Sequence, residues 1–196
     1  MTQAKPRFRT FEEYLNYDDG SDRRYELVDG ELVEMAPENP LNAMIARFLL
    51  VYFIQMGISI ERVGDKQQIA VISAKATARE PDLTVHSEAS AAAILTQKQA
   101  LIGLDMPVPT LVIEVVSPGK PGSENYDRDY IEKPKEYAGR GIPEFWRIDP
   151  DRAVVAVLTL RDGAYQLHEF RGSERVDSPT FPDLQLTAEL ILRAGR

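Results

Sequence analysis

The 196-residue sequence contains no cysteine. This absence excludes disulfide bridges, thiolate metal sites and cysteine nucleophiles, and it fits a protein made in a reducing compartment, so we expect a cytoplasmic location. The sequence also lacks any run near the roughly 20 apolar residues that span a bilayer, and residues 1–7 have no export-type apolar stretch behind them. We therefore expect no membrane partner.

Positive charge is also scarce, since the formal net charge is −8 and the isoelectric point lies near 4.9. A protein that coats nucleic acid through bulk charge usually has a basic footprint, so the balance argues against that class. Local clusters such as Arg23 with Arg24, or Arg128 with Lys133, can still face a phosphate. The length fits one globular domain, which we expect over residues 10–192.

Histidine is rare, and this limits the chemistry that the chain can perform. The two histidines, His86 and His168, have no partner at metal-ligand spacing, so packing or surface roles are expected for both. Ser117 lacks the flanking glycines of a nucleophile elbow and a histidine base, and it is expected to end a strand. No glycine-rich phosphate loop or dinucleotide fingerprint is present.

Local patterns in the first half of the chain predict both helices and strands. Thr10 and Glu13 have capping-box spacing, which begins a short helix. Asp29-Gly30 is a strong hairpin signal because both turn positions need a positive φ angle. Apolar residues then recur every three or four positions from residue 41 to residue 56, which is typical of a core-packing helix. The expected elements are helices at 10–17 and 40–56, a hairpin at 24–28 and 31–35, and strands at 58–63, 67–72 and 83–85.

The second half begins with an alanine-rich segment and contains one nearly unbroken β-branched run at residues 110–116. Such a run is the pattern of a strand buried on both of its faces. Pro134 should kink the helix that follows, or start a shorter helix near that point. The expected elements are helices at 88–101 and 126–140, strands at 110–116 and 144–148, and a hairpin at 153–160 and 165–170.

Glu114 is the strongest functional clue, because a charge in the centre of a buried strand is costly unless it is paired, protonated or bound to a metal. Asp82 starts a short strand in the Pro81-Asp82 pair. Two carboxylates on neighbouring strands can converge on a hard divalent ion such as Mg²⁺ or Mn²⁺. Glu26, beside the hairpin turn, is a third candidate ligand, although a cross-strand salt bridge is the simpler expectation for it.

Five segments carry a family resemblance in their order and spacing. They are YELVDG at 25–30, PDL at 81–83, EVVSP at 114–118, Lys133 with Tyr137, and GIPEFWRIDP at 141–150. Over about residues 10–192, the chain resembles the Uma-type restriction endonuclease family. The resemblance implies a PD-(D/E)XK core: an α/β, or mixed α+β, fold with a mixed central β-sheet flanked by helices, here with N-terminal and C-terminal β-hairpins. It also implies a metal-dependent phosphodiesterase site.

The lysine of that superfamily stands two positions after the acidic residue, on the same strand face. Val116 occupies this position here. The resemblance suggests that Lys133 of the following helix supplies the amino group instead, with Lys120 and Lys135 as rivals. Gln67 and Gln68 are further candidates for contacting a metal-held water or a phosphate.

These observations favour a Mg²⁺- or Mn²⁺-dependent DNA endonuclease, with Asp82 and Glu114 as ligands and Lys133 as the displaced lysine. Two alternatives stay open. A catalytically silent nuclease fold would bind DNA or protein, and a structural homo-oligomer would simply pair Glu114 within the core. A homodimer is expected, since closed two-fold dimers are the commonest oligomers.

Overall fold

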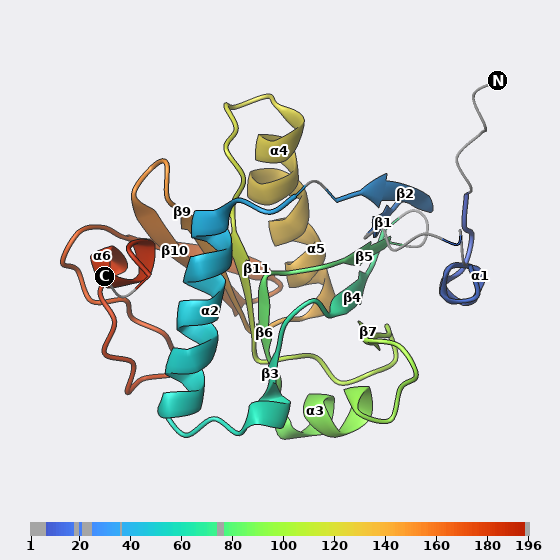
Figure 1. Cartoon of the computed structure of the whole chain (residues 1–196), viewed down its shortest axis with the longest axis horizontal. Coiled ribbons are helices and arrows are strands. Elements are labelled where there is room, and N and C mark those ends of the chain that lie inside the picture. Colours follow the sequence, from blue (N-terminus) through green and yellow to red (C-terminus); the bar gives the residue numbers. More distant parts are fainter. Residues whose placement is uncertain (1–6, 18–19, 21–24, 36, 74–76, 195–196) are drawn as a thin grey trace.

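The computed structural model describes residues 7–17, 20, 25–35, 37–73 and 77–194. Helices and strands alternate along these residues (Figure 1). The helices are α1 (Phe11–Leu15), α2 (Pro40–Gln55), α3 (Glu88–Ile94), α4 (Glu124–Asp127), α5 (Lys133–Arg140) and α6 (Ala188–Leu192), with a 3₁₀ turn η1 (Ile60–Arg62) and a π-helical turn η2 (Arg128–Glu132).

The strands form two mixed sheets. The smaller sheet has the order β2 (Glu31–Glu34), β1 (Tyr25–Val28), β5 (Thr77–Arg79), β4 (Gln68–Val71) and β7 (Leu101–Ile102). The larger sheet has the order β11 (Ala164–Phe170), β10 (Val154–Arg161), β9 (Glu144–Asp149), β8 (Leu111–Val115), β6 (Leu83–Val85) and β3 (Val63–Gly64). Two neighbouring pairs, β4 with β7 and β8 with β9, are parallel, and the other pairs are antiparallel.

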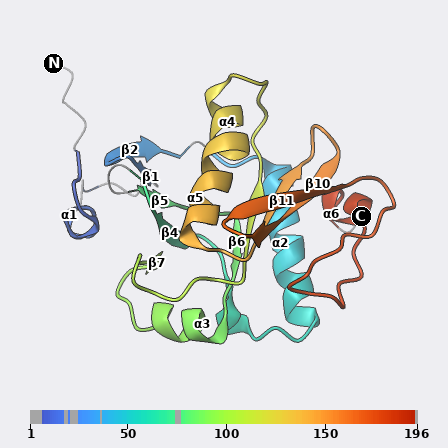
Figure 2. The ribbon, with the colours of Figure 1, turned by 180° about the vertical axis from the view of Figure 1, so that it is seen from behind.

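Strand β8 is buried on both faces, as its aliphatic composition predicts. Alternate residues of a strand point to opposite sides. Ile113 and Val115 pack with α2 in one hydrophobic cluster, whereas Val112 packs with Tyr137 of α5 in another. Helices α2 and α5 accordingly lie on opposite faces of the larger sheet, as Figures 1 and 2 show. Glu114 shares the face covered by α5.

The two sheets meet where β5 leads into β6. The three residues between these strands are Glu80, Pro81 and Asp82, so Asp82 stands where the chain passes from the smaller sheet into the larger one. Among the residues that the structure describes, no helix is long and apolar enough to cross a bilayer.

Two of the predicted elements are wrong in part. The strand expected at 58–63 is mostly the turn η1, and β3 begins only at Val63. The alanine-rich helix ends at Ile94, because few of its residues are buried against the core, and β7 follows it. The β-hairpins, α2 and the strands at β8 and β9 are confirmed within a few residues.

The helix expected at 126–140 is divided near Pro134, which is one of the two predicted outcomes. It consists of α4, η2 and α5, and the last of these starts at Lys133 with Pro134 in its first turn. Proline is tolerated in a first turn because its missing N–H would have no partner inside the helix. The short helix α6 has no counterpart among the predicted elements.

Candidate active site

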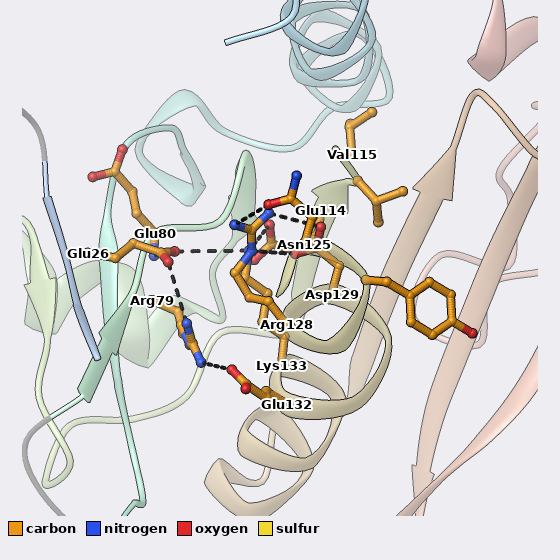
Figure 3. Close-up of polar contacts among 12 residues, drawn as sticks. Glu26, Arg79, Glu80, Glu114, Val115, Asn125, Arg128, Asp129, Glu132 and Lys133 are labelled. Atoms are coloured by element: carbon orange, nitrogen blue, oxygen red, sulfur yellow. Dashed lines mark hydrogen bonds and ion pairs between the residues drawn. The ribbon is translucent and has the colours of Figure 1, made fainter. Parts of the chain in front are cut away.

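A cavity of about 480 Å³ lies where the two sheets meet α2 and the α4–η2–α5 segment. Its lining includes every acidic residue singled out from the sequence, together with Lys133. Figure 3 shows Glu26, Glu114, Asp129 and Lys133 drawn together from different parts of the chain. We call Glu26, Asp82, Glu114, Asp129 and Lys133 the acidic cluster.

Glu114 is the fourth of the five residues of β8, and only 5% of its surface is exposed. Lys133 Nζ lies 2.7 Å from Glu114 Oε2, and the hydroxyl of Tyr137 donates to Oε1 at the same distance. The two donors come from one helix, α5, since residues four apart share a helical face. The buried carboxylate therefore has a partner on each oxygen, which explains how an aliphatic strand tolerates it.

Asp82 is half-buried beside Glu114, and its carboxylate reaches the neighbouring strand. Asp82 Oδ2 accepts a hydrogen bond of 2.6 Å from the backbone N–H of Val115. Its other carboxylate oxygen has no hydrogen-bond partner among the described residues, and Asp82 lines the cavity. The strand register thus holds one acid beside the other, with an oxygen available.

Lys133 is the lysine that the fold brings to the acids. It is 5% exposed, and its Nζ lies 3.4 Å from Asp129 Oδ1 and 4.0 Å from Glu26 Oε1, besides the contact with Glu114. The rival lysines, Lys120 and Lys135, are exposed and lie outside the cavity lining.

Asp129 is a member of the cluster that sequence reasoning missed. It is 2% exposed, and Arg128 donates to both of its carboxylate oxygens, at 2.9 and 3.1 Å. Asp129 belongs to η2, where the N–H of Lys133 bonds to the carbonyl of Arg128 five residues earlier. Such π turns are frequent at functional sites. The available signal was spacing, since Asp129 stands four residues before Lys133.

Glu26 joins the cluster from β1 of the smaller sheet. Its Oε1 accepts a hydrogen bond from the backbone N–H of Glu80, and its Oε2 lies 3.5 Å from Arg79 of β5. A cross-strand salt bridge is therefore present, although its partner lies on β5 and not on β2 of the predicted hairpin. The same side chain also lines the cavity within 4.0 Å of Lys133, and its role as a metal ligand stays a prediction.

Neither of the two glutamine candidates lines the cavity, and both side chains have hydrogen-bond partners elsewhere. Gln67 Oε1 lies 2.6 Å from a ring nitrogen of His86, and Gln68 bonds to the hydroxyl of Tyr14 and the carbonyl of Tyr25. His86 is fully buried and contacts Ser90 through its other ring nitrogen, which fits the expected packing role.

Burial and neighbouring charges raise the pKa of both Asp82 and Glu114. Burial raises the pKa of Asp82 to about 6, the negative charges of Glu38 and Asp129 add to the rise, and the Val115 N–H and Lys133 oppose it. An acid with such a pKa is partly protonated near neutral pH unless a cation is added.

The pKa of Glu114 is raised to about 8. Burial is the largest cause, the negative charges of Asp82, Asp129 and Glu26 add to the rise, and the attraction of Lys133 opposes it. Burial alone would lower the pKa of Lys133, but attraction to Glu114, Glu26 and Asp129 raises it instead. These two shifts imply opposite charge states for one contact. We take Lys133 as charged, because three carboxylates lie within 4.0 Å of its Nζ. The raised pKa of Glu114 then reflects its burial first and the neighbouring carboxylates second.

The donor set fits a hard divalent ion that keeps most of its water shell. Mg²⁺ commonly uses one or two carboxylates and several waters. Asp82 and Glu114 offer such oxygens, whereas the described residues contain no group of three or more His, Asp or Glu side chains placed to enclose a metal. A divalent charge would also lower the pKa of both acids by relieving their repulsion.

Comparison with known proteins gives the family. A family model named Uma2, described as "Putative restriction endonuclease", matches residues 11–189. Among solved structures, a protein from Anabaena variabilis described as "a putative nuclease belonging to DUF820" is similar with a TM-score of 0.66 and 17% identity, over 95% of this chain and 99% of that chain. This likeness supports the predicted restriction-endonuclease-like fold. No match was found among curated proteins. Because the Uma2 family model matches most of the length of the chain, the chain belongs to the Uma2 restriction endonuclease family.

Proposed function

We propose that the protein is an endonuclease that uses Mg²⁺ or Mn²⁺ to hydrolyse phosphodiester bonds in DNA. Membership of the Uma2 family supports a nuclease function in general terms. The observation that carries the finer proposal is the convergence of Asp82, Glu114 and Lys133, which come from the β5–β6 connection, a strand and a helix, on one cavity.

In this proposal, Asp82 and Glu114 hold the metal, and Glu26 flanks it on the side of the smaller sheet. A bound divalent ion would supply a Lewis acid for a phosphate oxygen and lower the pKa of an attacking water. The oxygen of Asp82 that lacks a protein partner is the ligand that needs least rearrangement. Glu114 can accept further contacts because a carboxylate offers about four lone-pair positions.

Lys133 is assigned the role of the missing strand lysine. The surrounding carboxylates favour its ammonium form, and they hold Nζ inside the cavity and away from solvent. From there it can orient a water or donate to a phosphate oxygen as negative charge grows in the transition state. Arg128, in the same cavity, is a second cation that can approach the substrate backbone, although Asp129 now binds it.

A catalytically silent nuclease fold is the second candidate function. The observation that favours it is that both oxygens of Glu114 already have protein donors, Lys133 and Tyr137, so the acid is satisfied without a metal. The net charge of −8 points the same way. A protein of this kind would bind DNA or another protein without cutting.

A cleavage assay tests the proposed activity. Plasmid and single-stranded DNA would be incubated with Mg²⁺ or Mn²⁺ and either wild-type protein, Asp82→Ala, Glu114→Ala or Lys133→Ala. Lys135→Ala is a matched control, because Lys135 is an exposed lysine two residues away on the same helix. We expect cutting by the wild type and the control, and losses of at least about 100-fold in the other three. Equal activity in all five proteins would assign the cutting to another site or to a contaminant.

Calorimetry separates the two candidate functions. Titration of Mn²⁺ into the wild type should release heat, and Asp82→Ala with Glu114→Ala should abolish that signal. An identical titration curve for the wild type and the double variant would favour the silent fold.

We also propose that the protein acts as a homodimer and that residues 10–192 form one domain. Enzymes that cut both strands of a duplex often carry two copies of the site, and two-fold closure is the commonest way to pair them. Gel filtration with light scattering tests the dimer, and a monomer mass at micromolar concentration would contradict it.

A further inference from the structure

Arg147 is a buried arginine without a polar partner. It lies in β9 with 7% of its surface exposed, and within the described part of the chain its side chain makes no hydrogen bond and no ion pair. Its nitrogen atoms nevertheless keep some contact with solvent, since none is among the fully buried polar atoms. Burial lowers its pKa, although its charge remains. A guanidinium held in this state is costly, so its presence calls for an explanation.

The position of Arg147 places it next to the acidic cluster. Strands β8 and β9 are parallel neighbours, and Arg147 is the register partner of Glu114. Paired residues on neighbouring strands point to the same face of a sheet, so Arg147 lies on the face covered by the α4–η2–α5 segment.

Two tyrosines from that segment cover Arg147. The guanidinium carbon lies 3.8 Å from the ring centre of Tyr130, and Tyr126 stacks on Tyr130 with centroids 4.3 Å apart and planes 6° from parallel. A second guanidinium, that of Arg152, lies 5.4 Å from the ring centre of Tyr126 and 5.1 Å from that of Tyr130. We call Arg147, Tyr130, Tyr126 and Arg152 the tyrosine–arginine stack.

Hydrogen bonds hold Tyr130 and Arg152 in place, whereas the side chain of Tyr126 has none among the described residues. Tyr130 donates its hydroxyl to Asp149, and Arg152 binds Asp149 at 2.6 Å and the carbonyl of Gly119 at 3.0 Å. Tyr126 is partly exposed, and its hydroxyl has no hydrogen-bond partner among the described residues. A fixed base therefore carries a partly exposed aromatic ring, Tyr126, at one end of the stack.

The charges that face the stack include both signs. The carboxylate of Asp149 is engaged by Tyr130 and Arg152, and Glu169 is paired with Arg171 at 3.0 Å. Arg147 is the cation of this group that lacks a paired carboxylate, so it leaves local positive charge in an acidic protein. A guanidinium matches the geometry of a phosphate, and an exposed tyrosine ring matches the face of an unstacked base.

We propose that the tyrosine–arginine stack binds a short single-stranded nucleic-acid segment, with one base on Tyr126 and the phosphate of a neighbouring nucleotide at Arg147 and Arg152. The assignment deepens the proposed nuclease function by naming where the substrate strand lies relative to the cavity. The same α4–η2 segment carries Asn125, Arg128 and Asp129 into the cavity lining, so a strand on the stack continues toward the acidic cluster. A duplex would not present a free base face to Tyr126.

Binding without metal tests the stack separately from cleavage. Fluorescence anisotropy would follow a labelled oligothymidylate of about 16 nucleotides, and a duplex of equal length, in EDTA. Tyr126→Leu should weaken single-strand binding about tenfold, whereas Tyr126→Phe keeps the ring and should stay within about twofold. Arg147→Met should also weaken binding and should reduce the slope of log affinity against log salt by about 0.7.

Two further variants control for folding and for general charge. Arg161→Met removes an exposed arginine at the hairpin end of β10, away from Arg147, and should change binding by less than about twofold. Because the side chain of Arg147 has no hydrogen bond among the described residues, Arg147→Met should stay folded and lose only the stabilisation from the contact of the guanidinium with Tyr130. Arg147→Lys, which keeps a charge but not the planar fork, gives a second measurement if the methionine variant fails to fold.

The possible outcomes separate the two proposals. Wild-type affinity and salt slope in both Tyr126→Leu and Arg147→Met would overturn the stack, even if the wild type cuts DNA. Equal weakening for single strand and duplex in Tyr126→Leu would also overturn it, because a base pair cannot stack on that ring. Single-strand binding that depends on both residues, in a protein that cuts nothing with Mn²⁺, would support the stack and contradict the nuclease.

Discussion

Arg79 supports the acidic cluster from beneath, and its removal should destabilise the whole protein. The side chain is 1% exposed and lies among three carboxylates: Glu26 at 3.5 Å, Glu132 at 2.9 Å, and Glu136, which it contacts at 2.7 and 2.9 Å. These contacts join β5, β1, η2 and α5, the elements that carry Glu26 and Lys133. Arg79→Met keeps most of the apolar stem and deletes only the guanidinium.

The expected loss follows from the burial of the partners. Removing one member of a buried ion pair typically costs about 3–5 kcal/mol, because the other charge stays uncompensated. Glu26 and Glu136 are 9% and 15% exposed, whereas Glu132 is 51% exposed and can be solvated. We therefore expect the low end of the range, about 3 kcal/mol. For a chain of this size that corresponds to a melting temperature about 6–12 °C lower.

Urea unfolding followed by circular dichroism measures this loss. Arg7→Met is the matched control, because Arg7 forms an equally short contact of 2.6 Å with Glu31 but the two side chains are 73% and 41% exposed. Exposed pairs of this kind contribute less than about 1 kcal/mol. A further variant, Arg79→Met with Glu136→Gln, should recover part of the lost stability, because it removes a carboxylate that Arg79→Met leaves without a cation. A loss below about 1 kcal/mol for Arg79→Met would refute the reasoning, since it would put Arg79 in the class of the surface pairs.

Three further predictions concern single side chains. Burial and the charge of Arg62 lower the pKa of His86 to about 4. The unfolded chain therefore binds a proton at this side chain near pH 6.5, whereas the folded chain does not. Unfolding free energy should fall by about 1–2 kcal/mol between pH 7 and pH 5, and His86→Gln should lack this part of the pH dependence; identical pH slopes would contradict it. Tyr137→Phe should cost about 1.5–3 kcal/mol in urea unfolding, because it strips one donor from buried Glu114, and a neutral effect would mean that water replaces the hydroxyl. Gly141 ends α5 with φ at +83°, so Gly141→Ala should cost about 1 kcal/mol, and an unchanged melting curve would show that the turn relaxes.

The sequence predicted the parts of the fold that depend on local patterns. The period of the apolar residues identified α2, the Asp29-Gly30 turn identified the first hairpin, and the aliphatic run identified β8 as a strand buried on both faces. These features depend on neighbours within a few residues, so they can be recognised before the chain folds. The predictions failed in part at 58–63 and 88–101, where the patterns were short and tertiary packing decided the outcome.

Some residues in and around the acidic cluster could be identified from the sequence, and others only from the structure. A carboxylate inside an aliphatic strand is unusual in the sequence itself, so Glu114 could be selected without knowledge of its three-dimensional surroundings. Asp129 and Arg79 gave no comparable signal, because acidic and basic residues on helices and at strand ends are ordinary. Their importance arises from burial, which the sequence does not state. The family resemblance already favoured Lys133 over Lys120 and Lys135, whereas its contact with Glu114 depends on where α5 begins.

Thus the sequence by itself determined the family, the main strands and helices, and two of the acids on which the proposed chemistry depends. Tertiary structure alone decided which groups gather around those acids, since the π turn η2 and the junction of the two sheets bring together residues up to about a hundred positions apart. It also decided that Arg147 is buried beside Glu114, with no hydrogen bond or ion pair from its side chain to the described residues. The physical reason is that local propensity acts over a few residues, whereas burial and charge compensation depend on distances between atoms that only the folded chain fixes.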